Sequence, residues 1–400
     1  MKDPLYGWVM VGCVFTLSAL SFGTLGSVSV FLKPLVLEFG WTRAEASLGY
    51  TVISFSSAIF GILWGQLADR YGSRYFGFMA SVAMSACLIL LSEQSSLIQF
   101  YSLYFVFGAL GNAMLGAPLY ANVGYWFKQN PGLALGITAA GGAFGQGVVP
   151  MGAALLIENY DWQSAYLILG VSYFLIGFPL AFLIKEPPAR QNSGTQQSTA
   201  DDNFPLGERE TIIWISCAIT FCCLCMSVPI VHLVPLLTDK GFTNESASSV
   251  LMILMFSGIF GRILGGKLGD MYGALPGYMM MSFGQTISVF WFPFLDSIFA
   301  LYALAIFFGF TYSGVMSAIL VCARTMVPPS YAARMMSITA FFGWGGMGMG
   351  GFVGGYLFDM QGNYFWSFYF ATVVGITNLG ILGLLALRIR QARVRDKVFG

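Results

Sequence analysis

The chain has 400 residues, of which 57% are hydrophobic and only 9% are charged, and its net charge is +1. A soluble domain carries about 25% charged residues, so this composition excludes an ordinary multidomain soluble protein. The near-neutral balance also offers no basic surface for nucleic acid, and apolar runs of about 20 residues predict an integral membrane protein.

The apolar runs predict twelve transmembrane helices. The first run is too long for a signal peptide and lacks a clear cleavage site, so we expect it to remain as the first span. The expected spans are residues 6–32, 44–67, 75–94, 98–127, 132–157, 161–184, 211–236, 245–269, 275–296, 298–325, 333–359 and 364–388.

A polar stretch divides these spans into two groups of six. Residues 185–210 are rich in Pro, Ser and Gln, which is typical of a flexible linker between 1–184 and 211–400. Lys and Arg cluster on the loops that share a side with this linker, and only Lys33, Arg43 and Lys240 fall on the other side. The positive-inside rule therefore predicts cytoplasmic termini and a cytoplasmic linker, in the inner cell membrane.

The two halves repeat with one offset of 201 residues. Several separated regions coincide at this offset, among them the pairs Gly40 and Gly241, Thr42 and Thr243, Asp69 and Asp270, Gly72 and Gly273, and Gly145 and Gly346. A constant offset over several helices indicates a duplication. It predicts an all-α membrane protein of two pseudo-symmetric six-helix halves with a substrate site between them.

Arg262 is the strongest candidate for a functional residue. Asp270 follows it by eight residues and marks the helix end, so Arg262 lies about 12 Å inside the membrane edge. A guanidinium there costs about 2.5–3.5 kcal/mol on insertion scales. The repeat-related residue is Gly61, so the fold does not require a cation at this depth. We predict that Arg262 binds an anionic substrate; the alternative is a structural arginine bonded to carbonyls or snorkelling.

The segment from Gly65 to Arg74, GQLADRYGSR, resembles the loop signature of the major facilitator superfamily. The resemblance covers the whole chain and implies that superfamily's fold of twelve helices. It also implies a gating role for Asp69, Arg70 and Arg74, and for Asp270 in the second copy of the loop.

A second resemblance concerns residues 126–141, WFKQNPGLALGITAAG. This segment is similar to the monocarboxylate transporter signature and, in part, to the oxalate/formate antiporter group. The resemblance implies that Arg262 pairs with a substrate carboxylate and that Lys33 takes part in proton and substrate binding. The sequence has Gly258 where monocarboxylate transporters carry an aspartate, and Gly343 where oxalate antiporters carry a second cation.

Other polar and aromatic residues complete the candidate site. Tyr120, Asn122 and Tyr312 are expected near the depth of Arg262, where they would bind substrate oxygens or form hydrogen bonds between helices. Phe341 and Phe342 would line the apolar part of the substrate or simply pack.

The single histidine, His232, is a candidate for proton coupling together with Lys33. Its place at the end of a span favours the alternative, a solvated histidine. Lys33 also lies near the membrane surface, where a lysine can snorkel to water.

These features predict a secondary transporter for a small monocarboxylate such as lactate or pyruvate, with the proton as coupling ion, no cofactor, no metal and a monomeric state. An organic-anion exchanger of the oxalate/formate kind is the alternative. An exporter of apolar compounds would not need Arg262. A membrane enzyme should show a catalytic or metal-ligand cluster, and the closely spaced Cys222, Cys223 and Cys225 are instead expected to pack within a helix.

Overall fold

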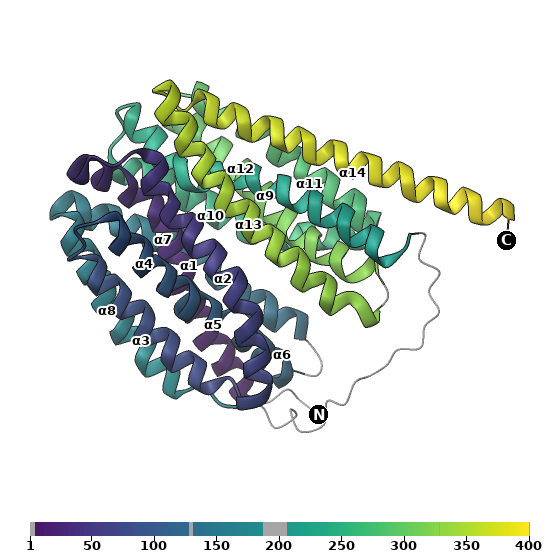
Figure 1. The fold of residues 1–400 in the computed structure, drawn as a ribbon, viewed down its shortest axis with the longest axis horizontal. Helices are drawn as coiled ribbons and strands as arrows, with labels where there is room; N and C mark the ends of the chain where they lie inside the picture. Colours follow the sequence, from purple (N-terminus) through teal and green to yellow (C-terminus); the bar gives the residue numbers. More distant parts are fainter. Residues whose placement is uncertain (1–4, 128–130, 187–205, 328, 400) are drawn as a thin grey trace.

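The structure is a computed structural model that describes residues 5–127, 131–186, 206–327 and 329–399, and every regular element in these ranges is a helix (Figure 1). The N-terminal group comprises α1 (Leu5–Phe39), α2 (Arg43–Tyr71), α3 (Arg74–Leu91), α4 (Leu97–Val106), the π-helix Phe107–Asn112, α5 (Ala113–Leu115), α6 (Ala117–Trp126), α7 (Pro131–Asn159) and α8 (Trp162–Phe182).

The C-terminal group begins after the linker. It comprises α9 (Glu208–Asp239), α10 (Asn244–Tyr272), α11 (Ala274–Val289), the 3₁₀ turn Phe292–Phe294, α12 (Ile298–Thr325), α13 (Pro329–Gln361) and α14 (Phe365–Phe399). Among the described residues, ten spans are long and apolar enough to cross a membrane. The helices α11 and α13 fall outside that set, so the full count of twelve stays a prediction.

The duplication is visible in the helix contacts. In the N-terminal group α1 packs on α7 and α3 on α8, and in the C-terminal group α9 packs on α13 and α11 on α14. The turns repeat as well, because Gly40 and Gly72 have positive φ, as do their partners Gly241 and Gly273. Only glycine adopts this backbone without strain. The domain limits stay a prediction, since most of the expected linker lies outside the described residues.

The fourth expected span, residues 98–127, is not one continuous helix. A π-helix interrupts it at Phe107–Asn112, and the backbone bends at Gly116 before α6 begins. The Asn112 amide nitrogen donates to Ser57 Oγ at 2.9 Å, and its oxygen accepts from Ser21 Oγ at 2.8 Å. This side-chain network joins α1, α2 and the π-helix inside the N-terminal half.

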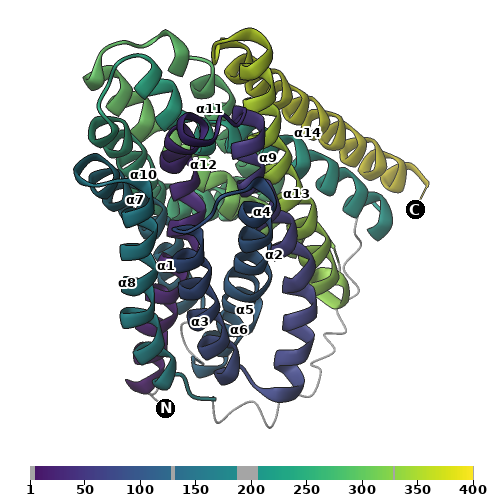
Figure 2. The same cartoon turned by 60° about the vertical axis from the view of Figure 1, so that its left-hand side comes forward.

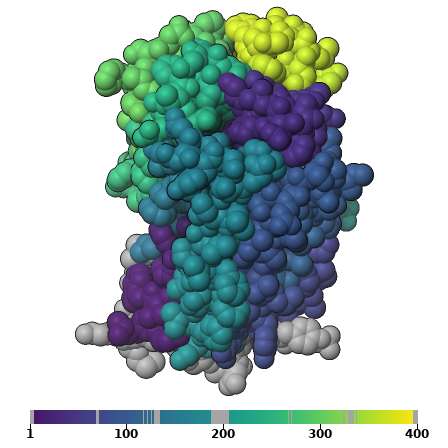
Figure 3. Space-filling view, turned by 90° about the vertical axis from the view of Figure 1, so that its left-hand side faces the viewer, coloured from purple at the N-terminus to yellow at the C-terminus, as the bar shows by residue number. Residues whose placement is uncertain are grey.

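The two halves meet along three helix pairs, α2 with α13, α7 with α10 and α1 with α9 (Figures 1 and 2). We call the end of the molecule that carries the α2–α3 and α10–α11 turns the linker end, and the other the opposite end. In the space-filling view, atoms of the two halves lie directly against each other (Figure 3).

Close packing of α1 on α7 predicts a sharp effect of enlarging Gly145. A Cβ at this position would lie 1.9 Å from the Ala19 carbonyl oxygen, a backbone atom that cannot rotate away. We expect Gly145→Ala to destabilise the protein by about 1–3 kcal/mol, because overpacking forces the helices apart. The matched control is Gly152→Ala in the same helix, where a Cβ would meet nothing within 4 Å. Equal apparent melting temperatures for the two variants would contradict this prediction.

Candidate functional site

A network of polar side chains joins the two halves at the opposite end. It combines residues of α1 and α2 with residues of α9, α13 and the start of α14. We call this group the interhalf cluster, and it consists of Lys33, Arg43, His232, Asp239, Asp359 and Tyr364.

Arg43 is the central member of the interhalf cluster. Its guanidinium donates to both Asp239 oxygens, at 2.9 and 2.7 Å, and to Tyr364 Oη at 2.8 Å. The same group lies 3.9 Å from the centre of the Phe358 ring. A planar, delocalised cation suits this combination of a two-oxygen contact and an aromatic face. Because Arg43 begins α2 and its partners lie in the C-terminal half, each of these contacts crosses between the halves.

Asp359 adds a second crossing contact. One carboxylate oxygen accepts the Arg43 backbone N–H at 2.9 Å, and the other accepts the Ala44 backbone N–H at 2.7 Å. These amides belong to the first turn of α2, where N–H groups lack partners within the helix and the helix dipole favours an anion. The end of α13 therefore caps the start of α2 in the other half.

His232 is buried within the interhalf cluster, with 0% of its surface exposed. The expectation of a solvated histidine was therefore wrong, because α13 covers this end of α9. Its Nε2 lies 2.7 Å from the Gly351 carbonyl oxygen, and its Nδ1 lies 3.3 Å from Tyr364 Oη. A carbonyl can only accept, so Nε2 carries a proton, and Nδ1 is free to accept from Tyr364. The hydrogen bonds thus run from Arg43 through Tyr364 and His232 to Gly351.

Lys33 is half-buried and its Nζ lies 3.1 Å from Asp239 Oδ1. The lysine belongs to α1 and the aspartate to the end of α9, so this ion pair also joins the halves. Lys33 and His232 thus lie in the same network, one on each side of Arg43. Their role in proton coupling stays a prediction.

Arg262 lies between the halves, nearer the linker end. Its Nη1 donates to the Ala139 carbonyl oxygen of α7 at 2.9 Å, and its buried Nε has no hydrogen-bond partner among the residues that the structure describes. Within the described ranges Arg262 forms no ion pair. The contact with Ala139 is one that a structural arginine could make, but one carbonyl leaves most of the guanidinium donors available.

Two tyrosines predicted for the site lie near this guanidinium. The Arg262 charge interacts electrostatically with the hydroxyls of Tyr120 on α6 and Tyr312 on α12. The Ser18 hydroxyl, which faces Tyr120, is buried without a partner at hydrogen-bond geometry among the described residues. The structure therefore brings Arg262, Tyr120 and Tyr312 together from both halves, with donors left for a ligand.

The predicted aromatic wall lies on α13. Phe341 and Phe342 pack edge to face, with ring centres 5.8 Å apart, and are 38% and 41% exposed. One turn further along the helix, Trp344 stacks on Phe22 of α1 at 6.0 Å, and Gly345 faces Phe55 of α2. Residues four apart share a helix face, so Phe341 lies on the side of α13 that faces the N-terminal half.

Asn122 forms hydrogen bonds between helices, which was the alternative to substrate binding. Its amide nitrogen donates to Ser73 Oγ and to the Lys185 carbonyl, and its oxygen accepts from Trp126 Nε1. These bonds join α6 to the start of α3 and to the end of α8 at the linker end. Since both amide hydrogens are used within the N-terminal half, we leave Asn122 out of the proposed site.

The predicted gating residues lie at the linker end. The side chains of Asp69, Arg70 and Asp270 lie outside the described part of the structure, so their gating role stays a prediction. The Arg74 side chain is exposed, and its backbone N–H donates to Glu186 Oε1 at 3.1 Å. The seven cysteines form no disulfide, and the closely spaced Cys222, Cys223 and Cys225 are buried in α9, as a packing role requires.

Sequence reasoning missed most of the interhalf cluster. Arg43 was used only to orient the chain in the membrane, and Asp239 was not singled out. Their pairing depends on two helix ends in different halves. Asp359 gave a signal that could have been used, because an aspartate at the end of one span can cap the start of another. Tyr50 gave no signal in the sequence, since a tyrosine in an apolar helix usually serves only to pack against its neighbours.

Comparison with known proteins is consistent with this architecture. A family model described as Major Facilitator Superfamily matches residues 14–343 and 259–398. The chain is 28% identical to monocarboxylate transporter 13 of Rattus norvegicus over 95% of this chain and 89% of the relative. It is 24% identical to the uncharacterized MFS-type transporter YcxA of Bacillus subtilis (strain 168), over 90% and 91%.

A solved structure shares the fold. A bacterial homologue of the human lysosomal transporter Spinster, in an inward-facing and unoccupied conformation, superposes with a TM-score of 0.67. It covers 98% of both chains at 16% identity. At this identity the likeness concerns the arrangement of the helices alone.

Proposed function

The chain belongs to the major facilitator superfamily, and from this premise we propose that it is a proton-coupled secondary transporter of a small monocarboxylate such as lactate or pyruvate. The two halves would rock about a central site and expose it to each side in turn. The proposal takes the linker end as cytoplasmic, in accordance with the distribution of Lys and Arg.

The observation that carries the proposal is the state of Arg262. Within the described residues this cation between the halves forms no ion pair, and its Nε has no hydrogen-bond partner. A carboxylate would supply the missing charge through two parallel hydrogen bonds. The hydroxyls of Tyr120 and Tyr312, which interact electrostatically with Arg262, would bind the remaining oxygen of a small hydroxy or keto acid.

We place proton coupling in the interhalf cluster rather than beside Arg262. A second proton on His232, at Nδ1, would remove the acceptor that faces Tyr364 and add a charge near Arg43. Both changes weaken the contacts that hold the opposite end closed. Proton uptake there would favour opening toward the outside, where substrate and proton enter together. Lys33 is the second candidate, because its ion pair with Asp239 belongs to the same contacts.

The test is uptake of labelled L-lactate into proteoliposomes with and without an inward proton gradient. We expect the gradient to stimulate uptake in the wild type. In His232→Gln, which can still donate to Gly351, we expect uptake without this stimulation. Lys33→Gln, in the same assay, tests the other candidate.

Three outcomes would change the proposal. Stimulation retained in both variants would exclude the interhalf cluster as the proton site. Uptake that requires a preloaded counter-anion would identify the exchanger of the oxalate/formate kind. If no small monocarboxylate is transported, either with a proton gradient or with a preloaded counter-anion, the proposed substrate class is refuted.

A further inference from the structure

The hydroxyl of Tyr50 is buried without a partner. Tyr50 lies on α2 with 0% exposure, and its Oη makes no hydrogen bond in the described part of the molecule. Other fully buried tyrosines differ: Tyr104 and Tyr166 bond each other at 2.9 Å, and Tyr173 donates to Leu20 O at 2.6 Å. A buried hydroxyl left unpaired destabilises a protein, so its retention calls for an explanation.

Packing does not explain the hydroxyl. The repeat-related residue in the other half, 201 positions later, is Leu251, which is also fully buried. The fold therefore accommodates a purely apolar side chain at this place in a half. Arg262 likewise has a residue without a polar side chain, Gly61, at its repeat-related position. Tyr50 and Arg262 are therefore both polar residues at the interface between the halves that the other half does not repeat.

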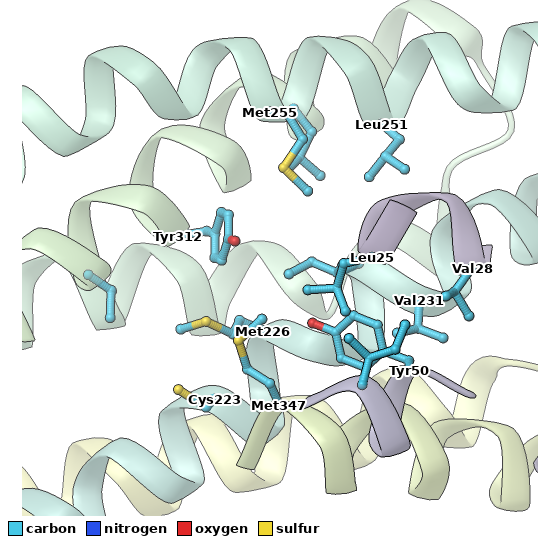
Figure 4. Close-up of a cluster of buried hydrophobic side chains, with 14 of the residues drawn as sticks. Leu25, Val28, Tyr50, Cys223, Met226, Val231, Leu251, Met255, Tyr312 and Met347 are labelled. Atoms are coloured by element: carbon cyan, nitrogen blue, oxygen red, sulfur yellow. The ribbon is translucent and has the colours of Figure 1, made fainter. Parts of the chain in front are cut away.

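Electrostatic interactions connect Tyr50 to Arg262 through Tyr312. The Arg262 charge interacts with the Tyr312 hydroxyl, and Tyr312 in turn interacts with Tyr50. Figure 4 shows Tyr50 and Tyr312 in the same buried cluster, with Leu25 beside Tyr50 and the Tyr50 hydroxyl on the side of its ring that faces Met226. The other labelled side chains of this cluster are apolar apart from Tyr312 and Cys223, so Tyr50 and Tyr312 offer hydroxyls among mostly hydrophobic side chains.

We propose that Tyr50 is a specificity-determining residue that binds a second oxygen on the substrate, beyond the carbon next to the carboxylate. This inference rests on the proposed function, in which Arg262 holds the carboxylate. Tyr312 would then face an oxygen at the 2-position and Tyr50 one at the 3- or 4-position. The preferred substrates would be short 3- or 4-hydroxy or oxo monocarboxylates rather than unsubstituted acids. The methionines nearby, Met226 and Met347, would adapt to their chain length.

The experiment measures binding of four acids of equal chain length to purified full-length protein by thermal stabilisation. The acids are butyrate, 2-hydroxybutyrate, 3-hydroxybutyrate and 4-hydroxybutyrate. In the wild type we expect the 3- or 4-hydroxy acid to bind about tenfold more tightly than butyrate. In Tyr50→Phe we expect that preference to disappear while butyrate affinity stays unchanged. Without ligand, Tyr50→Phe should melt at the same temperature as wild type or higher, because it removes an unpaired hydroxyl.

The control is Tyr278→Phe, which removes a fully buried hydroxyl that bonds Asn378 Oδ1 at 3.4 Å in the C-terminal half. It should lower stability and leave the order of affinities unchanged. An unchanged preference in Tyr50→Phe, or no preference in the wild type, would overturn the inference while leaving the carboxylate site intact. If none of the four acids stabilises the wild type but lactate does, this inference fails and the proposed function stands; if lactate fails as well, both fail.

Discussion

Arg262→Lys is expected to reduce lactate uptake at least about thirtyfold while the protein folds normally. Lysine keeps the charge and one donor for the Ala139 carbonyl, but it loses the planar fork that holds a carboxylate by two bonds. Removing one partner from a buried hydrogen-bonded charge pair costs about 2–5 kcal/mol. Uptake into proteoliposomes measures the loss, and the melting temperature without substrate shows whether the fold is retained.

A structural arginine makes the contrary prediction. In that case Arg262→Lys would transport normally, and any defect of Arg262→Ala would appear as a lowered melting temperature. The matched control is Lys267→Ala, in the same helix and exposed near the linker end. Normal uptake in that variant would exclude a general effect of charge in α10.

Arg43→Ala is expected to open the opposite end of the molecule. The change removes the contacts to both Asp239 oxygens and to Tyr364, while the backbone N–H that Asp359 accepts remains. Since these contacts exist only while the halves are together at this end, their loss shifts the equilibrium toward the open state. A loss of about 1.4 kcal/mol already corresponds to a tenfold shift.

A cysteine at Ser47 reports this opening. Ser47 is fully buried on α2, against Gly355 of α13, so a maleimide reaches it only when the halves separate. The background should carry Cys217→Ser, because Cys217 is an exposed native thiol. We expect labelling about tenfold faster in Arg43→Ala.

The control for Arg43→Ala lies at the same end but within one half. Lys240 donates to the Leu295 carbonyl and to Asp296, and all three belong to the C-terminal half. Lys240→Ala should leave the labelling rate of the cysteine at position 47 unchanged. Equal rates in wild type and Arg43→Ala would mean that the interhalf cluster does not control opening.

The helices and the repeat between the two halves could be predicted from the sequence because they depend on local and repeated features. Long apolar runs require helices in a membrane, since no water is present to satisfy backbone groups. The offset of 201 residues predicted equivalent turns, and the glycines at 40, 72, 241 and 273 share a positive φ. The fourth span was expected to be continuous, and the structure instead has a π-helix that ends at Asn112, whose side chain bonds Ser21 and Ser57 from other helices.

The sequence by itself determined the membrane fold, the family and the candidacy of Arg262, because an arginine deep in an apolar run is costly wherever the helix packs. Only the tertiary structure decided that His232 is buried, that Asn122 is used within one half, and that Arg43, Asp239 and Asp359 join the halves. It also revealed that the buried hydroxyl of Tyr50 has no hydrogen-bond partner in the described part of the chain. These properties depend on which helix faces meet across an interface between residues hundreds of positions apart, and neither periodicity nor spacing along one helix carries that information.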